Sequence, residues 1–213
     1  MLSIQKFTFS PMGENTYIVY NQHKTAAIID PGCYTDDEKE TLTNWIAKEN
    51  LTVKYLLCTH CHLDHVFGAK YVADTYQLQL HCHPNEEQLL AYAPVSGLNY
   101  GLPFDNYNGT IKYIDTTNII TLDEDELHIL FTPGHSPGSI SFYAKNEGFV
   151  VSGDVLFYES IGRTDLPMGN HQQLLSTILT QLYTLPASVK VYSGHGQPTT
   201  IGYEMQHNPF IKA

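Results

Sequence analysis

The fold of this chain of 213 residues is decided by one stretch, Thr59-His60-Cys61-His62-Leu63-Asp64-His65. It places three histidines and one aspartate within six residues, directly after the apolar run Val53–Cys58. That run has the length and composition of a buried strand. After the stretch, apolar residues recur at helical spacing at positions 66, 69, 72 and 73. The sequence therefore predicts a strand, a ligand-rich loop and a helix, and open α/β sheets place their active sites at such strand ends.

Short apolar runs bounded by turn residues predict strands on both sides of this stretch. They lie at Leu2–Phe9, Thr16–Tyr20, Ala26–Ile29, Leu78–Cys82, Ile119–Leu122, Glu126–Phe131, Ser139–Tyr143, Phe149–Ser152 and Val189–Ser193. Thr35 and Glu38 have the spacing of a capping box, and Asn170 is the predicted cap of a helix over His171–Tyr183. Strands that alternate with helices in this order predict an α/β (α+β) chain, arranged as a four-layer αββα sandwich of two mixed β-sheets. We expect one domain over residues 1–213.

One long segment has no periodicity. After a predicted helix at Glu86–Tyr92, the residues Pro94–Gly109 are rich in Gly, Pro, Asn and Tyr. Loops of this length are uncommon in compact domains and often carry function, so we expect substrate contacts there.

The composition excludes several classes of partner. Acidic residues outnumber basic ones, 22 against 11, and the basic residues form no cluster. Because phosphate binding uses clustered positive charge, nucleic acid and anionic membranes are poor candidate partners. The amino terminus lacks the pattern of a signal peptide, and no segment approaches the roughly 20 apolar residues of a membrane span. We expect a cytoplasmic protein whose four cysteines stay reduced.

Three later turns carry the same residue types beside glycine, each at the end of an apolar run. They are Pro133-Gly134-His135-Ser136, Ser152-Gly153-Asp154 and Ser193-Gly194-His195-Gly196. With His60, His62, Asp64 and His65 they supply five histidines and two aspartates, too many ligands for one tetrahedral ion. Imidazole and carboxylate suit zinc, iron or manganese, so we predict two divalent ions, with zinc as the first choice. Two ions roughly 3.5 to 4 Å apart can share a hydroxide and polarise a carbonyl, which predicts hydrolysis of an activated carboxylic derivative.

These motifs also carry a family resemblance. Thr59–His65 resembles the Thr-His-x-His-x-Asp-His signature of the metallo-β-lactamase superfamily, and the three later motifs match its other ligand motifs in order. The resemblance implies the metallo-β-lactamase fold. It implies that one ion is bound by His60, His62 and His135, the other by Asp64, His65 and His195, and both by Asp154. Asp64 is then also catalytic, because it orients the attacking hydroxide.

Two further segments are similar to parts of the compact bacterial glyoxalase II-like hydrolases. They are Gly162-Arg163-Thr164-Asp165-Leu166-Pro167 and Gln206–Phe210. This resemblance implies a thioesterase that acts on a small-molecule thioester of the acyl-glutathione type. Full-length glyoxalase II has a C-terminal helical domain that helps bind glutathione, whereas this chain ends some 18 residues after His195. We expect no separate substrate domain, and the thiol carrier stays open.

Candidate substrate contacts follow closely after Asp154. The two candidate contacts are Tyr158 and Arg163. Arg163 could bind a carboxylate of the substrate through two of its nitrogens. An ion pair between Arg163 and Asp165 is the equal alternative, and it would make both residues structural.

Several other functions stay open. The main alternative is a persulfide dioxygenase on the same fold, with one iron held by two histidines and an aspartate. A lactonase, a β-lactamase, a phosphodiesterase and a non-catalytic binding module are others, since the fold alone names no substrate. Cys58 and Cys61 form a Cys-x-x-Cys pair that would suit redox chemistry, although proposed ligands interleave it. His81 and His83 are interpreted as structural or supporting histidines. Nothing in the sequence indicates the oligomeric state.

Overall fold

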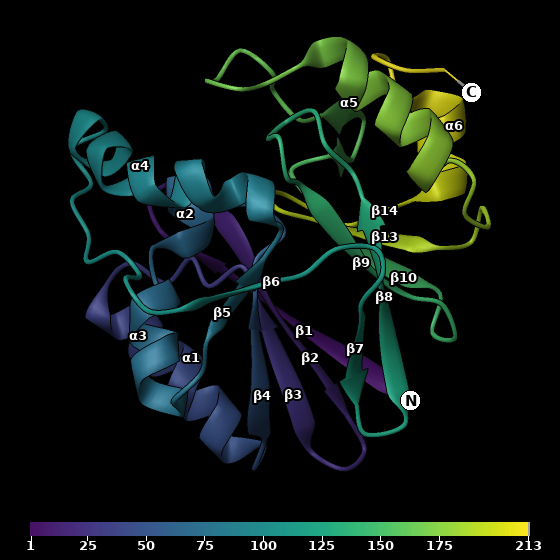
Figure 1. The fold of residues 1–213 in the computed structure, drawn as a ribbon. Coiled ribbons are helices and arrows are strands. Elements are labelled where there is room, and N and C mark those ends of the chain that lie inside the picture. Colours follow the sequence, from purple (N-terminus) through teal and green to yellow (C-terminus); the bar gives the residue numbers. More distant parts are fainter. Residues whose placement is uncertain (213) are drawn as a thin grey trace. The chain divides into compact units, whose positions relative to one another are not determined.

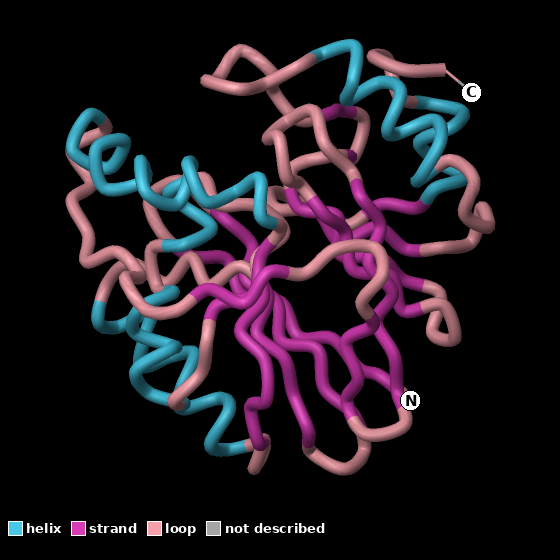
Figure 2. Tube along the Cα trace, viewed as in Figure 1, coloured by secondary structure: helices cyan, strands magenta, loops and turns pink. Residues whose placement is uncertain are grey.

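A computed structural model gives the structure of residues 1–212 (Figures 1 and 2). The chain forms two compact units: unit 1 contains residues 1–114 and 121–125, and unit 2 contains residues 115–120 and those from 126 onward. Each unit is built on one six-stranded sheet that mixes parallel and antiparallel neighbours. Two mixed sheets with helices confirm the predicted α/β class. One domain for the whole chain stays a prediction.

The sheet of unit 1 has the strand order β1-β2-β3-β4-β5-β6. Its strands are β1 (Leu2–Phe9), β2 (Glu14–Asn21), β3 (Thr25–Ile29), β4 (Thr52–Leu57), β5 (Leu80–Cys82) and β6 (Ile111–Tyr113). The first three strands pair antiparallel because short turns connect them. From β3 onward all neighbours are parallel, since each connection passes through a helix. The carboxyl ends of β3 and β4 therefore lie side by side, at Ile29 and Leu57.

Helices pack on this sheet and form the core of unit 1. They are α1 (Asp36–Lys48), α2 (Leu63–Val66), α3 (Ala69–Tyr76), the 3-10 turn η1 (Pro84–Glu86) and α4 (Glu87–Asn99). The predicted capping box is confirmed, because Thr35 Oγ1 accepts from the Glu38 N–H and the Glu38 carboxylate accepts from the Thr35 N–H. Apolar side chains of α1, α3 and α4 are buried in one core with those of the strands. Figure 1 shows α1 and α3 beside the strands of this sheet.

Helix α4 corrects the predicted loop over Pro94–Gly109, because the helix continues through Pro94 to Asn99. Proline has no N–H to donate, so inside a helix it leaves the carbonyl four residues earlier without its usual partner. The Asn106 side-chain amide donates to that carbonyl, which belongs to Leu90, at 2.8 Å. A side chain from the following loop thus replaces the missing backbone bond, and no local sequence pattern indicates this.

The sheet of unit 2 has the order β14-β13-β10-β9-β8-β7. Its strands are β7 (Ile119–Leu122), β8 (Asp125–Phe131), β9 (Ile140–Ala144), β10 (Phe149–Gly153), β13 (Lys190–Ser193) and β14 (Thr199–Thr200). The strands β11 (Leu156–Phe157) and β12 (Ser160–Ile161) form a separate hairpin. The helices are α5 (His171–Thr177), its π-helical continuation η2 (Ile178–Leu182) and α6 (Ile201–His207). Asn170 caps α5 as predicted, because its side chain accepts from the Gln173 N–H at 3.0 Å.

The longer predicted strands are all present, within a few residues at their ends. The sequence does not predict β6, β11, β12, β14 or α6. The strands among these have two or three residues, which leaves no readable alternation of apolar and polar positions.

Candidate metal centre

Four of the predicted ligands lie in unit 1, where β4 ends. Because β4 stops at Leu57 and α2 starts at Leu63, His60 and His62 lie in the connecting loop, while Asp64 and His65 lie on α2. The His60 ring centroid is 4.9 Å from that of His62 and 4.0 Å from that of His65. His65 Nε2 is 3.9 Å from Asp64 Oδ2. The fold of unit 1 therefore gathers these four side chains, which we call the unit 1 ligand group.

Asp30 adds a buried carboxylate to this region, although its Asp-Pro-Gly setting indicates only a turn. It follows β3, the parallel neighbour of β4, with a left-handed φ of 52°. Its Oδ1 accepts from the Thr59 N–H at 2.7 Å, and its Oδ2 accepts from the Thr59 hydroxyl at 2.6 Å. Oδ2 also lies 3.1 Å from His65 Nδ1, and Thr59 Oγ1 lies 3.1 Å from His60 Nδ1. Asp30 therefore orients two predicted ligands, His65 directly and His60 through Thr59.

The side chains of Asp30 and of the unit 1 ligand group together have donors that fit a divalent cation. Asp30, His60 and His65 each offer a ligand atom within 4.8 Å of the others. A carboxylate at Nδ1 of a histidine fixes the ring and directs Nε2 towards a metal, which is the usual support for a metal-binding imidazole. The sequence carries no signal for this role of Asp30, because the contacts of Asp30 depend on the pairing of β3 with β4.

Glu14 is a second buried carboxyl group near the same loop. An added Cβ at Gly32 would lie 1.9 Å from Glu14 Oε2 and 2.7 Å from the Asp64 carbonyl oxygen, so only glycine fits between them. Glu14 Oε2 accepts from the Thr16 hydroxyl at 2.9 Å, and Thr16 Oγ1 accepts from the Gly32 N–H at 2.9 Å. Burial raises the pKa of Glu14 well above its usual range. Glu14 therefore packs closely behind the loop, and its burial disfavours the charged form of its carboxyl group.

The four cysteines are buried free thiols in unit 1. The Cys58 thiol donates to the His65 carbonyl oxygen at 4.0 Å, so this thiol lies against the helix that carries two of the predicted ligands. Burial raises the pKa of Cys33 to about 12, and the hydrogen bond with Cys58, together with burial, raises the pKa of Cys61. Reactive thiols need exposure and a lowered pKa. The redox alternative for the Cys-x-x-Cys pair therefore has no support in this geometry.

His81 and His83 have structural contacts, in agreement with their interpretation. The His81 Nδ1 lies 3.2 Å from the Leu56 carbonyl oxygen and 3.0 Å from that of Gln79. The His83 side chain accepts from the Asn85 N–H at 3.2 Å and so caps η1.

The three other predicted ligands lie in unit 2, at the ends of β8, β10 and β13. One oxygen of Asp154, Oδ2, lies 3.5 Å from His135 Nε2 and 3.6 Å from His195 Nε2. The His135 Nδ1 lies 2.7 Å from the Arg163 carbonyl oxygen. Because a carbonyl only accepts, the His135 Nδ1 carries a proton in this contact, and Nε2 faces Asp154. We call these three residues the unit 2 ligand group, in which one carboxylate lies between two imidazoles.

Gly134 sets the position of His135. It has a φ of 135°, and an added Cβ would lie 2.4 Å from the Leu174 backbone of α5. Only glycine permits this close approach of the loop to the helix.

The two candidate substrate contacts have partners within unit 2. The single arginine of the chain, Arg163, donates from Nε and from one terminal nitrogen to the two oxygens of Asp165, both at 2.7 Å. The hydrogen bonds from Arg163 lower the pKa of Asp165 to about 2. The Tyr158 hydroxyl lies 3.0 Å from that of Tyr203, and their rings are stacked with centroids 5.2 Å apart. The ion-pair alternative is thus present, as an exposed bidentate pair.

Glu204 on α6 connects the segments that follow two of the ligands. Its buried carboxylate accepts from the Glu159 N–H at 3.0 Å, from Asn208 Nδ2 at 2.8 Å and from the Thr199 hydroxyl. Glu159 belongs to the hairpin after Asp154, and Thr199 to the strand after His195. The predicted motif Gln206–Phe210 therefore has a structural role here, because the Asn208 amide also donates to the Ser160 carbonyl at 3.0 Å.

Both ligand groups offer imidazole and carboxylate donors, the set that suits zinc, iron and manganese. No helix within residues 1–212 is long and apolar enough to cross a membrane.

Comparisons with known proteins agree with this chemistry. Residues 10–195 match the profile of the Metallo-beta-lactamase superfamily. The chain is 34% identical to a hydroxyacylglutathione hydrolase, GloC, of Haemophilus influenzae, a match that covers 100% of this chain and 99% of that protein. It is 35% identical to a probable metallo-hydrolase, YqgX, of Bacillus subtilis, with 97% of this chain and 96% of that protein covered.

Two solved structures are similar to this chain over nearly its whole length. The protein BLEG-1, described as a B3 metallo-beta-lactamase, is similar with a TM-score of 0.90 and 38% identity, over 99% of this chain and 100% of that one. The protein TTHA1623, solved in a di-iron-bound form, is similar with a TM-score of 0.87 and 32% identity, over 97% of this chain and 100% of that one.

Proposed function

Because this chain belongs to the metallo-beta-lactamase superfamily, we propose that it is a binuclear metallo-hydrolase that cleaves thioesters of the acyl-glutathione type. The observation that supports two ions is the Asp154 carboxylate oxygen between two imidazole nitrogens. The hydroxyacylglutathione hydrolase from Haemophilus influenzae, similar over the full chain, supports the thioester.

The proposal assigns all seven predicted ligands. His60, His62 and His135 would bind one ion, Asp64, His65 and His195 the other, and Asp154 both. Zinc is proposed for both ions, with iron as the alternative that the di-iron form of TTHA1623 supports and manganese as a third choice. Such ions lower the pKa of bound water and polarise a carbonyl.

The side chains of this chain would position the reactants. Asp64 is the proposed catalytic residue, because a carboxylate at its position accepts a hydrogen bond from the attacking water and orients it. Asp30 fixes His65 and, through Thr59, His60. Arg163 would exchange Asp165 for a carboxylate of the substrate, and Tyr158 would contact the substrate from the hairpin after Asp154. A thiolate leaves without a dedicated acid, since a thiol has a pKa of only about 8.5.

We propose a small-molecule thioester as the partner, with no nucleic acid and no membrane, because the chain carries a formal charge of −11. A cytoplasmic location is proposed because its four cysteines are free thiols.

The test combines metal analysis with a thioester assay. The purified protein should contain two ions per chain by mass spectrometry, and hydrolyse S-lactoylglutathione when loaded with zinc, iron or manganese. Asp64→Asn should lose most of this activity while the protein stays folded. At most one ion per chain, with no thioester hydrolysis for any of the three metals, would refute the proposal.

A second candidate function is β-lactam hydrolysis, which the 38% identity to BLEG-1 favours. The same metal-loaded preparation should be assayed with a chromogenic cephalosporin. A larger kcat/KM for the cephalosporin than for the thioester would replace the first proposal with the second. Oxygen consumption with glutathione persulfide would instead identify the dioxygenase.

A further inference from the structure

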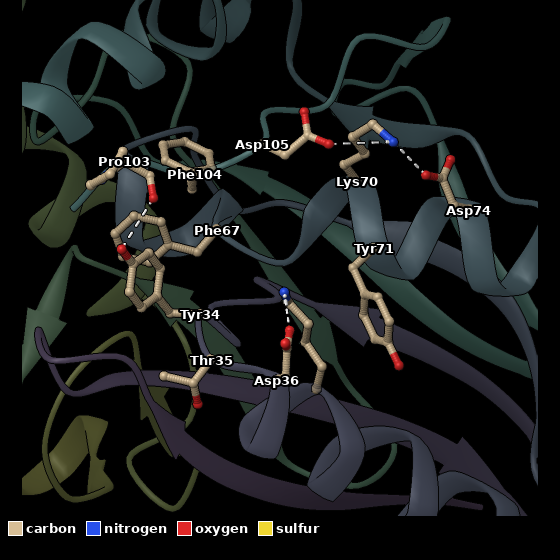
Figure 3. A pocket seen from close by; sticks show the side chains of 11 residues that line it. Tyr34, Thr35, Asp36, Phe67, Lys70, Tyr71, Asp74, Pro103, Phe104 and Asp105 are labelled. Carbon is tan, nitrogen blue, oxygen red and sulfur yellow. Dashed lines mark hydrogen bonds and ion pairs between the residues drawn. The ribbon is translucent and has the colours of Figure 1, made fainter.

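Unit 1 contains a pocket of about 500 Å³ that none of the predicted metal ligands lines (Figure 3). It is formed by the segment around the start of α1, by α3, and by the loop residues 103–105. Its volume lies within the range of small-molecule sites, roughly 300 to 1,000 Å³. The pocket does not enter the proposed thioester chemistry, so its occupant is a separate question.

Aromatic rings form one side of the pocket. The buried Phe67 ring is 4.9 Å from the Tyr34 ring, at an interplanar angle of 56°, and 4.9 Å from the Phe104 ring, at 87°. The Tyr34 hydroxyl donates to the Pro103 carbonyl at 3.1 Å, which holds the loop against this wall. Figure 3 shows these rings together and Tyr71 separately, on α3. The wall is therefore apolar, and its segments are connected to one another.

Charged groups form the rest of the lining, and carboxylates outnumber ammonium groups. Lys39 pairs with Asp36 at 2.9 Å, and Lys70 pairs with Asp74 at 2.6 Å. Asp105 lies 3.6 Å from the same Lys70, so it shares an ammonium group that Asp74 already binds more closely. With three aspartates against two lysines, the lining carries one uncompensated negative charge. The formal charge of −11 on the chain adds a field that attracts cations.

The pocket already contains one contact of the kind that a cationic ligand would make. The Lys39 ammonium lies 5.7 Å from the centroid of the Tyr71 ring, within the range of cation–π attraction. An anion, in contrast, would have to displace an aspartate from a lysine and would meet the uncompensated negative charge.

We propose that this pocket binds a small molecule with one positive charge and an apolar or aromatic body. The cationic group lies at Asp105, whose side chain is 81% exposed and most weakly paired. The body lies against Tyr34, Phe67 and Phe104. The chemical class is that of aryl-alkyl amines and quaternary ammonium compounds.

Benzyltrimethylammonium is a suitable probe, and phenylmethanesulfonate is its anionic counterpart. Binding to the metal-loaded, full-length protein is measured by NMR titration of backbone amides. We expect saturable shifts in residues around the pocket with the cation and none with the anion. Phe104→Ala and Asp105→Asn should each weaken binding about threefold or more, because the first removes a contact with the apolar body and the second removes the ionic contact with the cationic group.

Two matched variants control for general effects. Tyr92→Ala removes a 47% exposed ring of α4 that does not line the pocket, and Glu40→Gln removes an exposed charge of α1 outside the lining. Both should bind the cation as the wild type does. No saturable shift with the cation, or equal binding of the anion, overturns the proposal. Unchanged affinity in Asp105→Asn also overturns it, even if Phe104→Ala has weakened binding, because Asp105 lies at the surface and its loss does not disturb the aromatic wall.

Discussion

Replacing Asp30 by asparagine tests whether one buried carboxylate supports the unit 1 ligand group. Asparagine tolerates the left-handed φ of 52° at this position, so the change removes the charge without straining the backbone. The carboxylate accepts two hydrogen bonds from Thr59 and contacts His65 Nδ1. A hydrogen bond to a charged group contributes roughly 1.5 to 3 kcal/mol, and the amide keeps one acceptor, so the free energy of unfolding should fall by about 2 to 4 kcal/mol. Loss of such a supporting partner lowers metal affinity roughly 10- to 100-fold.

Thr59→Val is the matched control for this prediction. It removes the hydroxyl that connects Asp30 to His60 but keeps the Thr59 N–H bond and the contact between Asp30 and His65. We expect a smaller loss of stability and weaker binding of one ion only, whereas Asp30→Asn weakens both. Urea unfolding gives the stability, and metal content after dialysis against a chelator gives the affinities. If Asp30→Asn retained both ions and wild-type stability, the supporting role of Asp30 would be refuted.

Three other predictions follow from buried groups. The pKa of Glu14 in the folded protein lies above its unfolded value of about 4.5. When the pH rises from the unfolded pKa to the folded pKa, the unfolded chain releases this proton while the folded protein keeps it. The free energy of unfolding of the wild type therefore falls over that pH range. Glu14→Gln should remove this fall, and urea unfolding of both proteins at acidic and neutral pH measures it; an identical pH dependence would contradict it. Glu204→Gln replaces a carboxylate that accepts from three residues with an amide, and it should lower the free energy of unfolding by roughly 2 to 4 kcal/mol. The exposed Glu40→Gln should change it little. The four cysteines should react with an aromatic disulfide reagent only after denaturation, because they are buried thiols, and rapid labelling of the native protein would contradict this burial.

Local patterns in the sequence predict the class of the fold, which the structure confirms, and they single out the proposed ligand residues. The stretch from His60 to His65 could be proposed because a strand, a ligand-rich loop and a helix follow one another within a single segment. His135, Asp154 and His195 could be found because each stands beside glycine where an apolar run ends. Those signals depend only on neighbouring residues.

The supporting residues could not be found in this way. Asp30 contacts Thr59 only because β3 and β4 are parallel neighbours, a pairing between distant segments. Glu204 lies on a short helix that no periodicity marks, and its partners come from two separate loops. Their roles depend on register and packing rather than on composition.

The bond between the Asn106 side chain and the Leu90 carbonyl has a consequence for how this chain can vary. Pro94 leaves the Leu90 carbonyl without a helical donor, and the Asn106 amide donates to it instead. The effects of substitutions at positions 94 and 106 therefore depend on each other. Pro94→Ala would restore the helical hydrogen bond to Leu90 and make Asn106 dispensable. Loss of Asn106 alone would leave the Leu90 carbonyl without a donor and remove a contact that holds the loop with Phe104 and Asp105. Variation in this loop is therefore constrained by a proline in the preceding helix.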